Sequence, residues 1–122
     1  MPDKIDEGTL DQGIILFNQQ RFFEAHEAWE IAWKKAQGEE KVFFQCLIQI
    51  AAALLHAERS NWRGAEALRN KARSKLNGLP PHIAGIQIED LLAILDQYLV
   101  PGSKGKRFAT PLLRRQSKEA SA

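Results

Sequence analysis

One stretch, residues 40–58, limits most strongly what this chain can fold into. Between Val42 and Leu55 it is apolar nearly all round a helix, as expected of a helix that other elements surround. We therefore expect it to be the central helix of a bundle. Its longest apolar run, Cys46 to Leu55, is interrupted by Gln49 and is shorter than the roughly 18–20 apolar residues that cross a bilayer, so we expect no membrane span.

Four further segments carry apolar residues at helical spacing. Thr9 with Gln12 has the form of a capping box for a helix that begins at residue 9. Gly38 suits the C-terminal cap of a helix that ends near residue 36. Ser60 or Asn61 suits the N-terminal cap of a helix that begins near residue 61. Because no stretch alternates with period two, the sequence predicts an all-α fold, a compact bundle of about five helices forming one domain over residues 1–100. The four additional helices are expected at residues 9–19, 21–36, 61–77 and 87–99.

Residues 101–122 differ from this body in charge and composition. The whole chain has a formal charge of +2, which divides into −3 for residues 1–100 and +5 for the remainder. We expect a basic, mostly irregular C-terminal tail, with Phe108, Leu112 and Leu113 able to dock onto the body. The tail offers one functional alternative, a basic surface for RNA, together with the cations Arg59, Arg63, Arg69, Lys71, Arg73 and Lys75.

Several classes of protein are excluded by what the sequence lacks. Cys46 is the single cysteine, so no internal disulfide and no cysteine-based metal knuckle can form, and its apolar surroundings predict inert core packing. There is no glycine-rich phosphate loop, so no nucleotide cofactor is expected. The acidic N-terminus has no secretory apolar segment, which predicts a cytoplasmic protein.

Polar residues interrupt two of the apolar segments at helical spacing. His26 and Glu30 share one side of their helix, and Glu27 lies about 100° around it. On the predicted central helix, Gln45, Gln49, Ala52 and His56 form a continuous stripe. Antiparallel packing of the two helices would bring His26 and the glutamates opposite Gln49 or His56, and an unpaired buried polar group costs about 1–3 kcal/mol.

Three interpretations of this cluster stay open. It is a structural hydrogen-bond network, in which Glu24, Gln45, Gln49 and Asn61 are the further candidates. It is a ligand or proton-transfer pocket, whose catalytic candidates are His26, Glu27, Glu30 and His56. Alternatively it is a divalent metal site, and hence a metal-dependent enzyme, built from His26, Glu30 and His56.

A faint internal repeat offers another function. Four small or aromatic residues of the second helix recur 40 positions later, in a pattern that resembles one helix of tetratricopeptide-type hairpins. We interpret the repeat as a packing device, and its functional counterpart is an adaptor that binds a protein partner or a second copy of the chain. The matching residues are Phe22, Ala25, Ala28 and Ala32 against Trp62, Ala65, Leu68 and Ala72.

Two blocks, FNQQRFFEAHEAWEIAWKKA and FFQCLIQIAAALLHAERSNWRGAEAL, resemble the family called domain of unknown function 309 over residues 14–77. The resemblance implies a bundle of about five helices and assigns no activity. Gln20, Cys46 and Ser60 stand where glycine is frequent in that family, which changes two turns and one helix contact. The family's motif positions correspond here to Glu24, His26, Glu27, Glu30, Trp33, Gln49, His56, Asn61 and Gly64.

Overall fold

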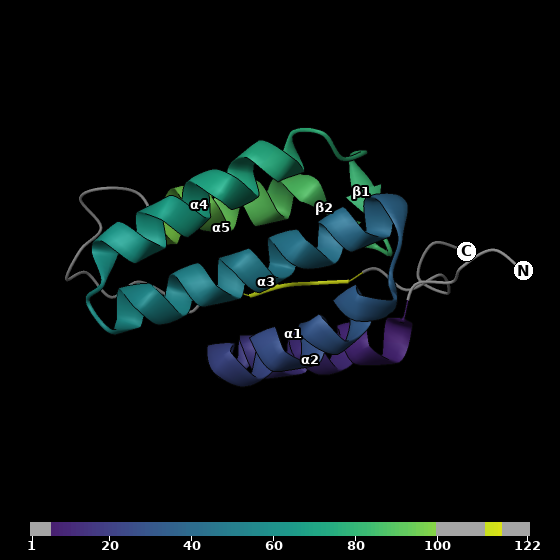
Figure 1. Ribbon diagram of the computed structural model, residues 1–122, viewed down its shortest axis with the longest axis horizontal. Helices are drawn as coiled ribbons and strands as arrows, with labels where there is room; N and C mark the ends of the chain where they lie inside the picture. Colours follow the sequence, from purple (N-terminus) through teal and green to yellow (C-terminus); the bar gives the residue numbers. More distant parts are fainter. Residues whose placement is uncertain (1–5, 100–111, 116–122) are drawn as a thin grey trace, which may run out of the picture.

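The computed structural model describes residues 6–99 and 112–115, which contain five helices and one short β-hairpin (Figure 1). The predicted all-α bundle is confirmed, and every predicted helix end lies within two residues of the observed one. The elements are α1 (Glu7–Asn18), α2 (Phe22–Lys35), α3 (Gly38–Glu58), α4 (Trp62–Leu76), β1 (His82–Ile83), β2 (Ile86–Gln87) and α5 (Ile88–Tyr98).

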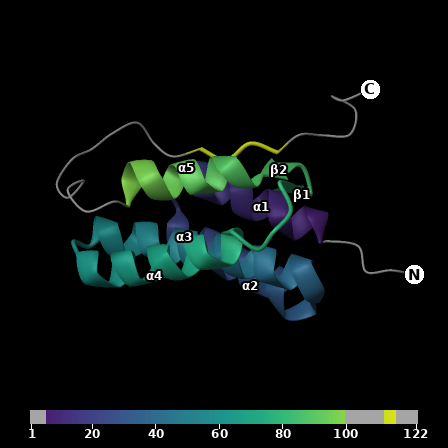
Figure 2. The same ribbon diagram turned by 90° about the horizontal axis from the view of Figure 1, so that it is seen from above.

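The helices form two layers. One layer consists of α2, α3 and α4, with α3 in the middle, and α1 and α5 lie behind it (Figures 1 and 2). By length and composition alone α3 would qualify as a membrane span. Its central place in the bundle accounts for that apolar composition, because one side of α3 supplies much of the core.

The helices α2 and α4 pack on opposite sides of α3 through small residues (Figure 1). Ala25 and Ala32 of α2 and Ala65 and Ala72 of α4 are each at most 1% exposed, and alanine lets helix backbones approach closely. Cys46 lies at the α3–α4 contact, with its Sγ 3.9 Å from the Ala72 carbonyl oxygen. Burial raises the pKa of the Cys46 thiol to about 11, in keeping with the predicted inert role.

The tryptophans differ in burial. Trp29 is fully buried and donates a hydrogen bond from Nε1 to the Leu10 carbonyl, 3.2 Å away. Its ring lies against Gly13, where a Cβ would fall 2.1 Å from Nε1, so α1 can approach α2 this closely only with glycine there. Trp33 and Trp62 are only partly buried.

Three local predictions were wrong. Asp6 caps α1 in place of Thr9, because its carboxylate accepts hydrogen bonds from both the backbone N–H and the hydroxyl of Thr9 (3.1 and 2.8 Å); these bonds lower the pKa of Asp6. Gly38, with φ +62°, opens α3 and does not cap α2. The β-hairpin was missed because its two-residue strands are too short to show a period of two; Ala84 and Gly85 turn it with positive φ.

In two turns a residue other than glycine adopts the left-handed backbone conformation, with a positive φ. Gln20, between α1 and α2, has φ +65°, and Ser60, between α3 and α4, has φ +61°. These are two of the positions where the resembled family frequently has glycine, which adopts such angles without steric strain. The two departures therefore leave the turns themselves intact.

The C-terminal strap, residues 112–115, returns to the body and runs between α1 and α5, on the side of the bundle away from the face that α2, α3 and α4 share (Figures 1 and 2). Leu113 is 3% exposed and belongs to the core, so its predicted docking is confirmed. Leu112 is 54% exposed. Phe108 and the basic residues Lys104, Lys106, Arg107 and Lys118 lie outside the described residues.

Candidate functional site

The polar stripe of α3 lies on the side of the helix that faces away from the core. Leu47, Ile50 and Leu54 occupy the core side and are buried. The stripe residues are half-buried between α2 on one edge and α4 on the other. We call this surface of the α2–α3–α4 layer the outer face; on α3 it comprises Gln45, Gln49, Ala52 and His56.

On the α2 edge of the outer face, His26 and Glu30 are neighbours, as their spacing predicted. The His26 Nε2 lies 3.5 Å from a Glu30 carboxylate oxygen, a separation too long for a strong hydrogen bond. The imidazole stacks on Phe23, with ring centroids 6.2 Å apart and planes inclined by 17°. Phe23 itself is 50% exposed, so an aromatic and an ionisable pair are presented together.

Three side-chain polar atoms of α2 and α3 are buried without a hydrogen-bond partner in the part of the chain that the structure describes. They are the Nδ1 of His26, the Nε1 of Trp33 and the Oε1 of Gln49. An indole N–H can only donate and a glutamine carbonyl oxygen can only accept. The two helices therefore hold one donor without an acceptor, one acceptor without a donor and an imidazole nitrogen that can serve as either, and we call these three atoms the open polar seam.

Lys41 fixes the indole that contributes to the seam. Its ammonium lies 4.2 Å from the centroid of the Trp33 ring and donates a 3.1 Å hydrogen bond to the Trp33 carbonyl oxygen. A cation over an indole face is attracted by the ring quadrupole. The sequence alone did not identify the Trp33 N–H as part of a site; Lys41, eight residues later, was the available signal.

His56 belongs to a different arrangement, the turn between α3 and α4. Its Nδ1 lies 2.9 Å from the Asn61 amide nitrogen, which donates, so the neutral imidazole carries its proton on Nε2. The Asn61 carbonyl oxygen accepts from the Gly64 backbone N–H at 3.1 Å and caps α4, so Asn61 is the cap of the two predicted candidates, Ser60 and Asn61. A Cβ on Gly64 would fall 2.7 Å from the Asn61 amide, so glycine leaves room for this cap.

The remaining predicted site residues lie apart from the seam. Glu24 pairs with Arg21 at 2.9 Å on the surface, and the Arg21 hydrogen bond lowers the pKa of that carboxyl. Glu27 is exposed, and Gln45 is half-buried on α3. No hydrogen bond, ion pair or ring contact within residues 6–99 and 112–115 joins His26 to His56.

The predicted metal ligands do not converge in the part of the chain that the structure describes. There, no group of three or more histidine, cysteine, aspartate or glutamate side chains lies close enough to hold a metal ion. His26 and Glu30 form one pair on α2, while His56 is bonded to Asn61 at the end of α3. The geometry of the described residues therefore favours a hydrogen-bonding surface over a metal centre.

The cations of α4 have different neighbours. The charge of Lys75 lowers the pKa of the buried Cys46 thiol, against the larger effect of burial, which raises it. Two other cations of the proposed RNA surface are engaged elsewhere, since Arg69 and Arg73 both pair with Asp96 of α5, at 3.4 and 2.6 Å.

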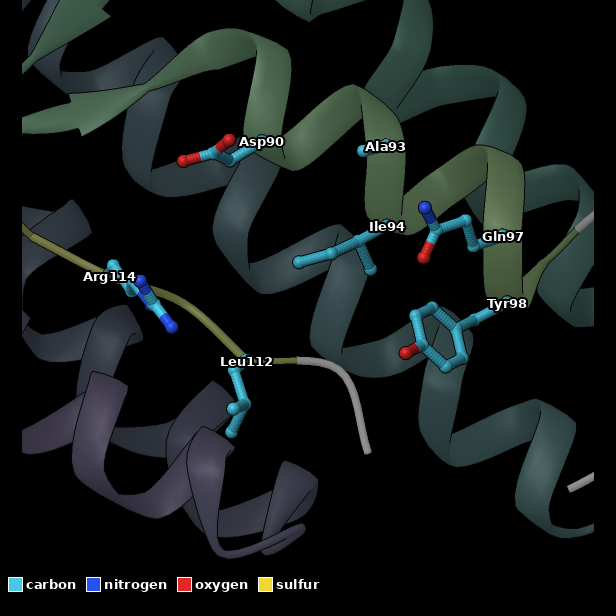
Figure 3. A pocket seen from close by; sticks show the side chains of 7 residues that line it. All are labelled: Asp90, Ala93, Ile94, Gln97, Tyr98, Leu112 and Arg114. Atoms are coloured by element: carbon cyan, nitrogen blue, oxygen red, sulfur yellow. The ribbon is translucent and has the colours of Figure 1, made fainter. Parts of the chain in front are cut away.

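A pocket of about 340 Å³ lies away from the outer face, between α5 and the C-terminal strap (Figure 3). The strap contributes Leu112 and Arg114, and α5 contributes the rest. Sequence reasoning did not anticipate it, because its two walls are far apart in the chain. The α5 residues are Asp90, Ala93, Ile94, Gln97 and Tyr98.

Comparison with known proteins gives one family. Residues 10–68 match the family model described as Domain of unknown function (DUF309), which spans α2 and α3, nearly all of α1 and the first half of α4. The match contains both sides of the open polar seam and the Asn61 cap. A comparison with curated proteins gave no match.

Proposed function

Since residues 10–68 make the chain a member of the DUF309 family, whose name carries no activity, we propose a function from the site: the protein is a small helical binding module. Its outer face holds an extended segment of a partner protein along the junction of α2 and α3. The partner's backbone or polar side chains complete the hydrogen bonds of the open polar seam. The protein acts by binding, and no residue of the face is assigned a chemical step.

The observation that carries this proposal is the set of unpaired atoms in the seam. Buried polar groups are nearly always hydrogen-bonded, and an unpaired one costs about 1–3 kcal/mol. Three such atoms on two helices that pack together, His26 Nδ1, Trp33 Nε1 and Gln49 Oε1, are unfavourable for a purely structural network. A bound segment that supplies one acceptor and one donor recovers this free energy.

The shape and the charges of the face favour a polypeptide. The half-buried stripe lies along α3 between two flanking helices, which suits an extended chain that contacts several side chains in succession. Glu27 and Glu30 carry negative charge on α2, and Lys71 and Lys75 carry positive charge on α4. We therefore expect a partner segment with a basic residue on the α2 side and an acidic one on the α4 side.

Selection from a peptide library tests the proposal and identifies the preferred partner sequence in one step. A displayed random-peptide library is selected against the wild-type chain and depleted against Gln49→Arg, whose long cationic side chain blocks the seam. Enriched peptides are then titrated into ¹⁵N-labelled protein. We expect shifts to concentrate at the indole N–H of Trp33, the side-chain amide of Gln49 and the backbone around His26.

Glu89→Arg on α5 is the matched control, because Glu89 is exposed and lies off the outer face. Peptides should bind this variant as they bind the wild type. If selection enriches nothing, or if the shifts map to another surface, the binding proposal is wrong and the polar residues act only in packing.

A further inference from the structure

A second recognition feature lies on the opposite side of the bundle, where the chain binds part of itself. The strap crosses the gap between α1 and α5, and its residues are held by three unlike contacts: a backbone contact, an apolar contact and a charged contact. These are the contacts by which proteins recognise extended peptides. They are independent of the outer face and of the function proposed for it.

Asn18, the last residue of α1, forms two hydrogen bonds with the backbone of the strap. Its side-chain amide nitrogen donates to the Leu113 carbonyl at 3.1 Å, and its carbonyl oxygen accepts from the Leu113 N–H at 2.8 Å. One amide thus satisfies both backbone groups of a residue 95 positions away. Such a pair of bonds fixes an extended segment without depending on its side chains.

The side chains of Leu113 and Arg115 provide specificity. Leu113 is 3% exposed in the hydrophobic core. The guanidinium of Arg115 donates to both carboxylate oxygens of Asp11 (2.8 and 2.9 Å), to the Ala84 carbonyl (2.8 Å) and to Glu7. Charge-assisted hydrogen bonds of this kind are roughly twice as strong as neutral ones. We call the surface that holds the strap, which Glu7, Asp11 and Asn18 of α1 and the Ala84 carbonyl define, the groove; its contacts suit a leucine followed two residues later by an arginine.

Twelve residues, 100–111, separate Leu99 from the strap in the sequence. Leu112 of the strap and Tyr98 of α5 line the same pocket (Figure 3). A chain of twelve residues spans at most roughly 40 Å, which sets the upper limit of the distance over which a strap can reach a second copy.

We propose that the groove between α1 and α5 is a binding site for an extended Leu-x-Arg segment, and that a second copy of this chain supplies the competing segment through its own Leu113–Arg115. At low concentration each strap occupies its own groove, because a tethered segment has an effective concentration in the millimolar range. At higher concentration two copies exchange straps and form a symmetric dimer.

Two full-length variants separate groove from strap. Arg115→Glu has an intact groove, but its strap carries a glutamate that the carboxylates of Glu7 and Asp11 repel. The double variant Glu7→Lys, Asp11→Lys has an intact strap, but its groove carries two lysines that repel Arg115. Each alone should be monomeric by native mass spectrometry and light scattering, and an equimolar mixture should form a 1:1 heterodimer. Combining all three substitutions reverses both charges and should restore a self-occupied monomer.

A peptide probe tests the groove directly. A fluorescent peptide with the sequence of residues 111–118, PLLRRQSK, should bind Arg115→Glu at least about tenfold more tightly than the wild type, where the tethered strap competes. The same peptide with the position of Leu113 changed to aspartate should not bind. Arg115→Gln provides a second vacated groove if Arg115→Glu does not give a cooperative melting curve.

Two results would overturn the proposal. If the mixture stays monomeric, the strap serves only its own chain. If the peptide binds none of the vacated variants, the groove has no recognition capacity beyond the covalently attached segment.

Discussion

The two sides of the bundle differ in whether their polar side chains are paired. Around the strap, both amide atoms of the part-buried Asn18 and all three guanidinium nitrogens of Arg115 have partners. In the open polar seam, buried atoms of His26, Trp33 and Gln49 have none among the described residues. A satisfied polar group stabilises a fold and an unsatisfied one destabilises it. The hydrogen bonds of the strap therefore stabilise the fold of the isolated chain. The three atoms of the seam have no hydrogen bonds that would offset the cost of burying them.

The same contrast separates the two histidines that sequence reasoning placed together. His56 is hydrogen-bonded to Asn61 and belongs to a helix cap. His26 has one nitrogen 3.5 Å from Glu30 and the other buried without a partner. One histidine is explained by local structure, and the other is the better functional candidate.

Truncating Leu113 should produce the largest effect of the four changes that probe this contrast. Leu113→Ala removes buried methyl groups between α1 and α5 and should lower the free energy of unfolding by about 2–5 kcal/mol, measured by urea denaturation with tryptophan fluorescence. Leu112→Ala is the control, since Leu112 is 54% exposed and should change stability by no more than about 0.5 kcal/mol. Equal losses in the two variants would contradict the burial difference.

Asn18→Ala should come next. It removes both hydrogen bonds to the Leu113 backbone and leaves that N–H and carbonyl unpaired, at a cost of about 1–3 kcal/mol. Hydrogen exchange of the Leu113 amide should accelerate in parallel, because its acceptor is gone. Gln19→Ala, one residue along and exposed, should leave both quantities unchanged. Slow exchange in Asn18→Ala would show that the strap is held by other contacts.

The Asn61 cap should contribute less. Asn61→Ala removes the acceptor for the Gly64 N–H and the donor to His56, and should lower the free energy of unfolding by about 0.5–2 kcal/mol. Asn61→Asp keeps the acceptor and loses the amide donor, so comparison of the two variants separates the cap from the histidine contact. A shift in the His56 ring resonances is expected in both variants; unaltered resonances would place His56 outside the cap.

Gln49→Met should have the smallest effect on stability. The sign of the change in the free energy of unfolding is the informative result. It removes an unpaired buried acceptor while keeping the length of the side chain, so stability should be unchanged or rise by about 1 kcal/mol. Binding of peptides selected on the outer face should be lost in the same variant. A clear loss of stability in thermal melting would mean that Gln49 is satisfied in the folded chain, and the contrast between the two faces would disappear.

Much of the bundle was predictable because helical signals are local. The apolar spacing marked all five helices, and the separation of four residues placed His26 and Glu30 on one side of α2. The sequence offered Ser60 or Asn61 as the cap of α4, and the structure has Asn61 there. The Asp6 cap was missed because the Thr9 and Gln12 pattern competed with it one turn later.

The candidate sites were less predictable. A helix that is apolar nearly all round has no strong periodicity, so sequence reasoning placed Gln45, Gln49 and His56 on a buried surface, whereas the structure places them half-buried on the outer face. The Asn18–Leu113 pair joins residues 95 positions apart, and no local pattern encodes such a contact. Helix packing also decided that His56 belongs to the Asn61 cap and that His26 belongs to the seam.

The sequence by itself determined the helices, their approximate limits, the central place of α3 and the DUF309 domain of residues 10–68, because these depend on spacing and residue type along short stretches. Only the tertiary structure decided which polar atoms are satisfied. That property depends on which side chains of different helices meet, and two helices can pack with the same apolar stripes while their polar atoms pair or stay open. The assignment of the strap as a clamp and of the α2–α3 seam as the candidate binding site rests on that difference.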